Sequence, residues 1–274
     1  CRCAPAAHGH GAGTATRGMT QPRRTQGPRV VKFIQENCCH PDGELVGQQL
    51  IVHPWWKRVL YELFEIVDDP DSPGGWRRRY TEAYISIPKK NAKTTMLASL
   101  GLYLLLADDD PSALIVSAAA SEQQGANLLF GSAKTMCKLS PTLKQLTDPF
   151  ESEILVPSLP RARMMNVTSK VGTNDGLNAK GILADEGHEW LGMRGRNLYH
   201  VLKGGTGARH NALTVMITTA GYDQDSICFE KYAYGKKVQS GEIDDPGFYF
   251  KCVEAPEDCD HRDPKVWAMA NPLL

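Results

Sequence analysis

Residues 83–97 read Ala-Tyr-Ile-Ser-Ile-Pro-Lys-Lys-Asn-Ala-Lys-Thr-Thr-Met-Leu, and this stretch decides the fold. Residues 83–87 are apolar and predict a short strand. A basic loop follows the strand, and residues 94–107 predict a helix. A strand that runs through a basic loop into Lys-Thr and a helix has the architecture of a P-loop, the loop that binds the phosphates of a nucleotide.

The chemistry of such a loop depends on its place at the amino end of a helix. Backbone N–H groups there point at a bound phosphate, and the helix dipole favours its negative charge. Lys93 is expected to reach the β- and γ-phosphates, and Thr94 to offer its hydroxyl to Mg²⁺. Ile87 and Ala92 stand where the usual pattern has glycines, so a solvated lysine-rich turn is the alternative. The loop residues expected to bind the nucleotide are Pro88, Lys89, Lys90, Asn91, Ala92, Lys93, Thr94 and Thr95.

A second candidate element is an apolar strand that ends in two acids, at residues 181–190: Gly-Ile-Leu-Ala-Asp-Glu-Gly-His-Glu-Trp. This is the pattern of a Walker B element, in which Asp185 would hold Mg²⁺ and Glu186 would orient and deprotonate the attacking water. A strand followed by an ordinary acidic loop is the alternative. The P-loop candidate upstream strengthens the functional interpretation, since the two elements belong together. His188 would adjust Glu186, or be a plain loop histidine.

Elsewhere in the chain, short apolar strands alternate with helices. This alternation predicts an α/β fold with a mainly parallel sheet that helices cover on both faces. Upstream, residues 30–34 predict a short helix and residues 54–67 a second one, with a loop at 68–75. The further strands expected are 113–119, 153–157, 164–168, 213–218 and 248–253, and the further helices are 122–138, 197–202 and 227–240.

Composition and charge narrow the class of protein. Hydrophobic residues make up 42% of the 274 residues, which is enough to bury a core. Lys+Arg and Asp+Glu are both 31, so a DNA contact would need a local basic patch. No apolar run reaches the length of a transmembrane helix. The eight cysteines predict no disulfide framework and favour a reducing compartment.

Two smaller features need no special function. Residues 1–28 contain no acid and predict a disordered tail, with a transit peptide as the alternative. Met19 stands where a natural start would lie. Cys252, Cys259 and His261 match no zinc pattern.

The P-loop candidate also carries a family resemblance. Residues 87–95 resemble the deviant P-loop of tailed-phage terminase large subunits, which typically reads Pro-Arg-Lys-Asn-Gly-Lys-Ser/Thr. Further segments resemble the same family in the same order. They are residues 29–66 with Pro54-Trp55-Trp56, 117–126, 175–178, 184–189, 217–221 and 267–272.

The resemblance implies a RecA-like P-loop ATPase with a small N-terminal helical subdomain. It divides the chain into a tail at 1–28, a helical subdomain on the adenine side at 29–80, an ATPase core at 81–255 and the start of a linker at 256–274. A nuclease domain would follow that linker. The cofactors implied are ATP and Mg²⁺. The partners implied are double-stranded DNA, a portal protein, a small terminase subunit and further copies of the chain in a ring. The place implied is the cytoplasm of a bacterial host, without a membrane.

The resemblance also assigns roles outside the two motifs. Thr218 and Thr219 would sense the γ-phosphate and couple its loss to the grip on DNA. Trp55 and Trp56 would cover the adenine, although Trp56 replaces the glutamine expected to read it. An aromatic helix start buried in the core is the alternative for this pair.

Several arginines are expected to act on the ATP of a neighbouring copy of the chain or to contact DNA. Arg163 is the candidate arginine finger that would act on a neighbour's ATP, with Arg161, Arg194 and Arg196 as further candidates. A solvated surface arginine is the alternative for each. The run Arg77-Arg78-Arg79 would touch DNA or form a charged turn.

Two other functions fit the same motifs. One is a helicase-like P-loop ATPase, which would need a second RecA-like domain. The other is a degenerate nucleotide-binding scaffold that has lost its loop glycines. A scaffold would bind nucleotide without turnover.

Overall fold

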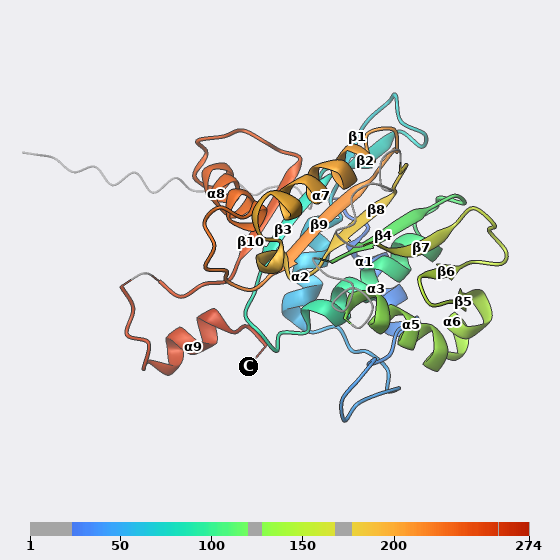
Figure 1. Cartoon of the computed structure of the whole chain (residues 1–274), viewed down its shortest axis with the longest axis horizontal. Helices are drawn as coiled ribbons and strands as arrows, with labels where there is room; N and C mark the ends of the chain where they lie inside the picture. Colours follow the sequence, from blue (N-terminus) through green and yellow to red (C-terminus); the bar gives the residue numbers. More distant parts are fainter. Residues whose placement is uncertain (1–23, 120–127, 168–176, 257, 274) are drawn as a thin grey trace, which may run out of the picture.

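A computed structural model describes residues 24–119, 128–167, 177–256 and 258–273. Its centre is an eight-stranded sheet with the order β10-β3-β9-β8-β4-β7-β6-β5 (Figure 1). The strands from β10 to β7 run parallel, and β6 runs antiparallel to both of its neighbours, β7 and β5. In that order the strands span Phe248–Cys252, Glu82–Ser86, Leu213–Thr218, Gly181–Ala184, Leu114–Ala118, Arg163–Val167, Glu153–Leu155 and Asp148–Pro149.

Helices cover both faces of this sheet, as the sequence predicts (Figure 1). Alternating residues of each strand face opposite sides. In β9, Leu213, Val215 and Ile217 enter one hydrophobic cluster and Met216 enters the other. The first face holds α1 (Gly27–Asn37), α2 (Pro54–Leu63), α3 (Lys93–Leu106), α5 (Leu129–Leu139) and α6 (Pro141–Leu146). The second face holds α7 (Gly192–Gly204) and α8 (Ile227–Ser240).

Most predicted elements are found near their predicted bounds. The strands at 181–184 and 213–218 and the helix at 227–240 coincide with β8, β9 and α8. The described part of the helix predicted at 122–138 begins at Leu129, and 122–127 lie outside the described residues. The helix predicted at 54–67 ends at Leu63, because Ile66–Asp68 forms β1 and pairs with β2 (Trp76–Arg78).

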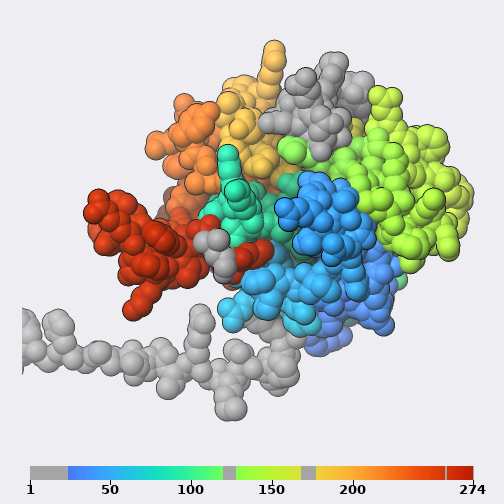
Figure 2. All heavy atoms as spheres, turned by 90° about the horizontal axis from the view of Figure 1, so that it is seen from below, coloured from blue at the N-terminus to red at the C-terminus, as the bar shows by residue number. Residues whose placement is uncertain are grey.

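The two ends of the described chain pack differently. Residues 24–28 are ordered against α2, since the backbone N–H of Gln26 donates to the Phe64 carbonyl at 3.0 Å. Helix α1 therefore begins before Arg29, and residues 1–23 lie outside the described residues. At the other end, α9 (Pro264–Ala270) buries none of its residues and projects from the body (Figures 1 and 2).

The topology places the site. Parallel strands all end at one edge of the sheet, here called the carboxyl edge, where loops can meet. Strand β9 lies between β3, which leads into the P-loop, and β8, which leads to Asp185. At the loop start, the backbone N–H of Ile87 donates to the Thr218 carbonyl at 3.0 Å. The two sequence motifs are thus brought to one place although they lie far apart in the chain.

Candidate nucleotide site

The P-loop candidate connects β3 to α3 and contains two residues in the left-handed conformation. Lys90 has φ 65° and Ala92 has φ 56°. This conformation costs roughly 1–2 kcal/mol for a residue with a Cβ, which is why glycine is usual there. Ala92 thus adopts the backbone of the glycine it replaces. The departure from the usual motif leaves the loop path intact.

Asn91 stabilises the conformation of this loop. Its side chain is buried, and its Nδ2 donates to the carbonyls of Pro88 at 3.2 Å and Lys89 at 3.1 Å. The indole Nε1 of Trp56 donates to the Asn91 carbonyl at 3.0 Å. The backbone N–H of Leu273 donates to Asn91 Oδ1 at 3.3 Å. Three separate segments of the chain therefore meet on one loop residue.

Lys93 is the first residue of α3 and is 6% exposed. Its Nζ donates to the Pro88 carbonyl at 3.2 Å, so the ammonium lies within the loop. Burial lowers the pKa of Lys93, and the carboxylates of Glu186 and Asp185 raise it. A phosphate in the loop would supply the negative charge that a buried ammonium lacks.

Thr94 and Asp185 join the two motifs. The Thr94 hydroxyl donates to Asp185 Oδ2 at 2.8 Å. Asp185 is 4% exposed, and burial raises the pKa of its carboxyl to about 6, while the Thr94 hydrogen bond lowers it. The indole Nε1 of Trp190 donates to the Asp185 carbonyl at 3.1 Å and fixes the strand end.

Glu186 leaves the strand in a left-handed conformation, with φ 47°. The turn is tight, since a Cβ on the next residue, Gly187, would lie 2.9 Å from the Met216 side chain. The Glu186 side chain is 26% exposed, and its Oε2 lies 3.3 Å from His188 Nδ1. The side chain is therefore partly accessible at the carboxyl edge, while its Oε2 is buried against His188.

His188 connects Glu186 to the predicted coupling threonines. Its Nδ1 lies 3.2 Å from the Thr218 hydroxyl and 3.4 Å from the Thr219 hydroxyl. Its backbone N–H donates to Thr218 Oγ1 at 3.0 Å. The sequence left open whether His188 is only a loop histidine. The structure places it between the acid and the end of β9.

The donor set at this edge fits Mg²⁺. Thr94 Oγ1 and the Asp185 carboxylate are hard oxygen ligands that are hydrogen-bonded to each other, and Asp185 is buried. Mg²⁺ is usually bound through one or two carboxylates together with substrate phosphates and waters. Within the described ranges, no group of three or more His, Cys, Asp or Glu side chains forms a metal site.

The two tryptophans predicted to cover the adenine differ in exposure. Trp56 is 3% exposed and is engaged with Asn91, while Trp55 is half-buried. Their rings meet edge to face, with centroids 4.9 Å apart. Trp56 therefore supports the loop, and only Trp55 presents part of its surface beside it.

The arginine candidates are scattered. Arg163 is the first residue of β7, so it lies at the opposite edge of the sheet from Asp185, and an arginine finger at this position would have to serve a neighbouring copy. Arg161 lies just before it. Arg196 pairs with Glu230 at 3.4 Å, and Arg194 is exposed at the start of α7.

The three arginines at 77–79 form ion pairs with acidic residues of the same chain. Arg78 is buried and pairs with Asp108, while Arg79 pairs with Glu65 at 3.0 Å. Arg77 lies 3.6 Å from Asp69. These ion pairs within the chain speak against a DNA contact, and the predicted charged turn is wrong for Arg77 and Arg78, because both lie in strand β2.

Sequence reasoning missed the supporting residues of the site. Asn91 was named only as a member of the loop, and Trp190 was not singled out at all. A tryptophan five residues after a strand-end acid has no local pattern that reveals its partner. The cysteines behave as predicted, since those in the described part of the chain are all free. No described helix has the length and apolarity to cross a membrane.

Comparisons with known proteins agree with this geometry. A family model described as terminase large subunit, ATPase domain, matches residues 72–237. The large terminase subunit of Enterobacteria phage HK97 is 29% identical over 254 residues, which are 91% of this chain and 47% of that protein. The crystal structure of the HK97 bacteriophage large terminase matches with a TM-score of 0.72 and 25% identity, covering 92% of this chain and 48% of that chain.

The chain therefore spans about half the length of the relatives it matches. Parts of the resembling segments, residues 120–126 and 175–176, lie outside the described residues. The family match nevertheless includes the P-loop, Asp185, Glu186 and the end of β9. Because that match extends over more than half of the sequence, the chain belongs to the family of terminase large subunit ATPase domains, which have a RecA-like α/β fold.

Proposed function

We propose that the chain hydrolyses ATP at the carboxyl edge of its sheet, between the P-loop and the end of β8. The observation that carries this proposal is the 2.8 Å hydrogen bond from the Thr94 hydroxyl to Asp185 Oδ2. It brings a phosphate-binding loop and an acidic strand end into the arrangement that phosphoryl transfer requires.

ATP would bind with its phosphates at the amino end of α3. Backbone N–H groups of the loop would donate to the phosphate oxygens, and the Lys93 ammonium would leave the Pro88 carbonyl to contact the β- and γ-phosphates. Trp55 is the residue best placed to cover the adenine, since Trp56 is buried under the loop.

Glu186 would act as the general base. It would accept a proton from the attacking water while the water oxygen bonds to the γ-phosphorus and the bond to the β,γ-bridging oxygen breaks, so that ADP leaves. Thr94 and Asp185 would hold Mg²⁺, which neutralises the charge on the phosphates when bound. His188 would pass the state of Glu186 to Thr218 and Thr219.

The work driven by hydrolysis would be the packaging of double-stranded viral DNA into a capsid. The partners would be DNA, a portal protein and a small terminase subunit, with copies of the chain in a ring. The place of action would be the cytoplasm of a bacterial host. The similarity to the HK97 large terminase subunit over 91% of this chain supports this assignment.

Phosphate release by the purified chain tests the proposal. We expect Mg²⁺-dependent release of phosphate from ATP that is lost in Glu186→Gln. Binding of a fluorescent ATP analogue without turnover would overturn the proposal and favour a nucleotide-binding scaffold. Strand separation of a duplex by the chain, in place of movement along it, would favour the helicase-like ATPase.

A further inference from the structure

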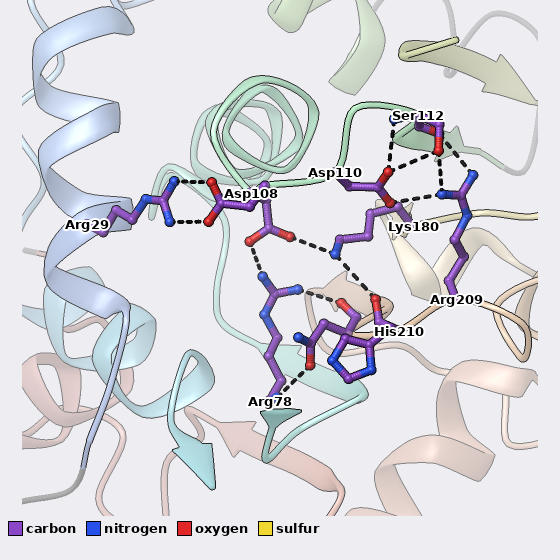
Figure 3. Close-up of polar contacts among 10 residues, drawn as sticks. Arg29, Arg78, Asp108, Asp110, Ser112, Lys180, Arg209 and His210 are labelled. Atoms are coloured by element: carbon purple, nitrogen blue, oxygen red, sulfur yellow. Dashed lines mark hydrogen bonds and ion pairs between the residues drawn. The ribbon is translucent and has the colours of Figure 1, made fainter. Parts of the chain in front are cut away.

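The edge of the sheet opposite the nucleotide site, here called the amino edge, carries a dense group of charges. Three consecutive acidic residues follow the end of α3, and each forms an ion pair with an arginine or lysine side chain (Figure 3). The ion pairs are Arg78 and Lys180 with Asp108, Arg29 with Asp109, and Arg209 with Asp110. Every acid of this run is therefore already neutralised within the chain.

Two arginines at the same edge have no such partner. Arg161 and Arg163 are exposed and lie on either side of the buried Ala162, at the start of β7. The backbone N–H of Arg163 donates to the Ala113 carbonyl at 2.9 Å, which fixes the strand here. Neither side chain contacts an acid in the described ranges. Their guanidinium groups are thus free to bind a ligand.

These arginines border a surface hollow of about 480 Å³. Arg209, Ser112 and Asn178 also line it, and no acidic residue does. The side chain of Arg209 is held in place, because its Nε donates to Asn178 Oδ1 at 2.9 Å and its Nη1 to the Ser112 hydroxyl at 2.9 Å. The hollow therefore combines a hydrogen-bonded Arg209 with two exposed arginines that have no acidic partner among the described residues.

The described charged residues that line the hollow are all positive. Arg161, Arg163 and Arg209 line the hollow, and none of its described lining residues is acidic. The formal net charge of the chain is zero. A surplus of positive charge around a concave surface attracts anions, and planar guanidinium groups bind phosphate oxygens in a bidentate geometry.

We propose that this hollow binds phosphate groups of the double-stranded DNA backbone through Arg161 and Arg163. The proposal rests on the proposed DNA-translocating function and names the surface that would touch DNA. Contacts of this kind position a duplex without reading its sequence, which suits a protein that must pass along any DNA. The hollow and the nucleotide site lie at opposite edges of the sheet, so that DNA and ATP would not compete for one surface.

Fluorescence anisotropy of a labelled duplex with the full chain, without ATP, tests the proposal. We expect Arg161→Ala/Arg163→Ala to bind at least tenfold more weakly at about 0.1 M salt, because each phosphate contact contributes roughly one power of the salt concentration. The slope of log affinity against log salt should fall by about two. Arg161→Lys/Arg163→Lys should recover most of the affinity, since the charge is kept.

The control is Lys138→Ala/Lys144→Ala, which removes the same charge from exposed positions on α5 and α6. It should keep the wild-type salt slope. An equal loss of DNA affinity in both double variants would overturn the proposal, since only net charge would then matter. Wild-type DNA affinity together with reduced ATP turnover in the arginine variant would also overturn it and assign the two arginines to the nucleotide of a neighbouring copy. Because DNA binding is measured without ATP, a failure here is separate from a failure of ATP hydrolysis.

Discussion

The hydroxyl of Thr94 donates a hydrogen bond to Asp185 Oδ2 at 2.8 Å, although the two residues are 91 positions apart in the chain. Thr94 lies in the first turn of α3, and Asp185 directly follows β8. The Thr94 hydroxyl and the Asp185 carboxylate offer oxygen atoms of the kind that bind a nucleotide-bound Mg²⁺. The contact brings the two residues that we propose as Mg²⁺ ligands into direct hydrogen-bond distance.

Replacing Lys93 should remove the charge that reaches the phosphates. We expect Lys93→Ala to weaken ATP binding roughly ten- to a hundredfold, the value of one charge-assisted hydrogen bond. Calorimetric titration with Mg²⁺-ATP measures this. Lys90→Ala is the control, because Lys90 is exposed at the loop tip. Loss of binding in Lys90→Ala with normal binding in Lys93→Ala would show that the loop alignment is shifted.

Ala92 should be a site where glycine stabilises the protein. Ala92→Gly relieves the left-handed strain of roughly 1–2 kcal/mol. The more flexible glycine also stabilises the unfolded chain by roughly 0.4–1 kcal/mol, which offsets part of that benefit. We therefore expect the free energy of unfolding to rise by about 0.5 kcal/mol. Urea unfolding measures the free energy. Ala107→Gly, at φ −132°, should instead destabilise. A loss of stability in Ala92→Gly would mean that the backbone at this residue is not left-handed.

Trp56, which belongs to α2, should stabilise the conformation of the P-loop. Trp56→Phe keeps most of the buried ring but removes the indole N–H that the Asn91 carbonyl accepts. An unsatisfied buried carbonyl costs about 1–3 kcal/mol, so the loop should populate other shapes. We expect a several-fold higher KM for ATP with kcat nearly unchanged. Trp76→Phe, in β2, serves as the control, and equal effects of both substitutions would remove the special role of the N–H.

His188 should matter for turnover more than for binding. It lies between Glu186 and the hydroxyls of Thr218 and Thr219. We expect His188→Ala to lower kcat roughly ten- to a hundredfold, because the general base loses its fixed position, while KM stays near the wild-type value. His200→Ala is the control on an exposed helix position. Steady-state kinetics with normal kcat in His188→Ala would mean that the contact is incidental.

Local sequence patterns predict the strands and helices of this fold well where apolar runs are long. Strands β8 and β9 and helix α8 are predicted to the residue, since their apolar runs have clear ends. Strand β1 falls where the sequence predicts a helix end and the start of a loop, and β2 falls where it predicts a DNA contact or a charged turn. These strands have three residues each, and such a strand depends on its partner more than on its own composition.

The motifs of the site could be predicted because phosphate and metal chemistry require particular residue types at fixed spacing. The supporting contacts could not. Asn91 meets Trp56 and Leu273 only after the chain has folded, over separations of 35 and 182 residues. Trp56 was expected at the adenine, because an aromatic residue at a helix start has the same sequence pattern whether it faces a ligand or a core.

The most direct test of the account compares Glu186→Gln with the wild-type chain in two measurements, calorimetric Mg²⁺-ATP affinity and steady-state phosphate release. Gln keeps the shape of the side chain but cannot accept a proton from water, and a general base contributes roughly 10²- to 10⁴-fold. We predict wild-type affinity and a loss of turnover of that size, whereas Asp185→Ala should lose affinity as well. Wild-type phosphate release by Glu186→Gln would contradict the account, because the acid at the end of β8 would then take no part in hydrolysis.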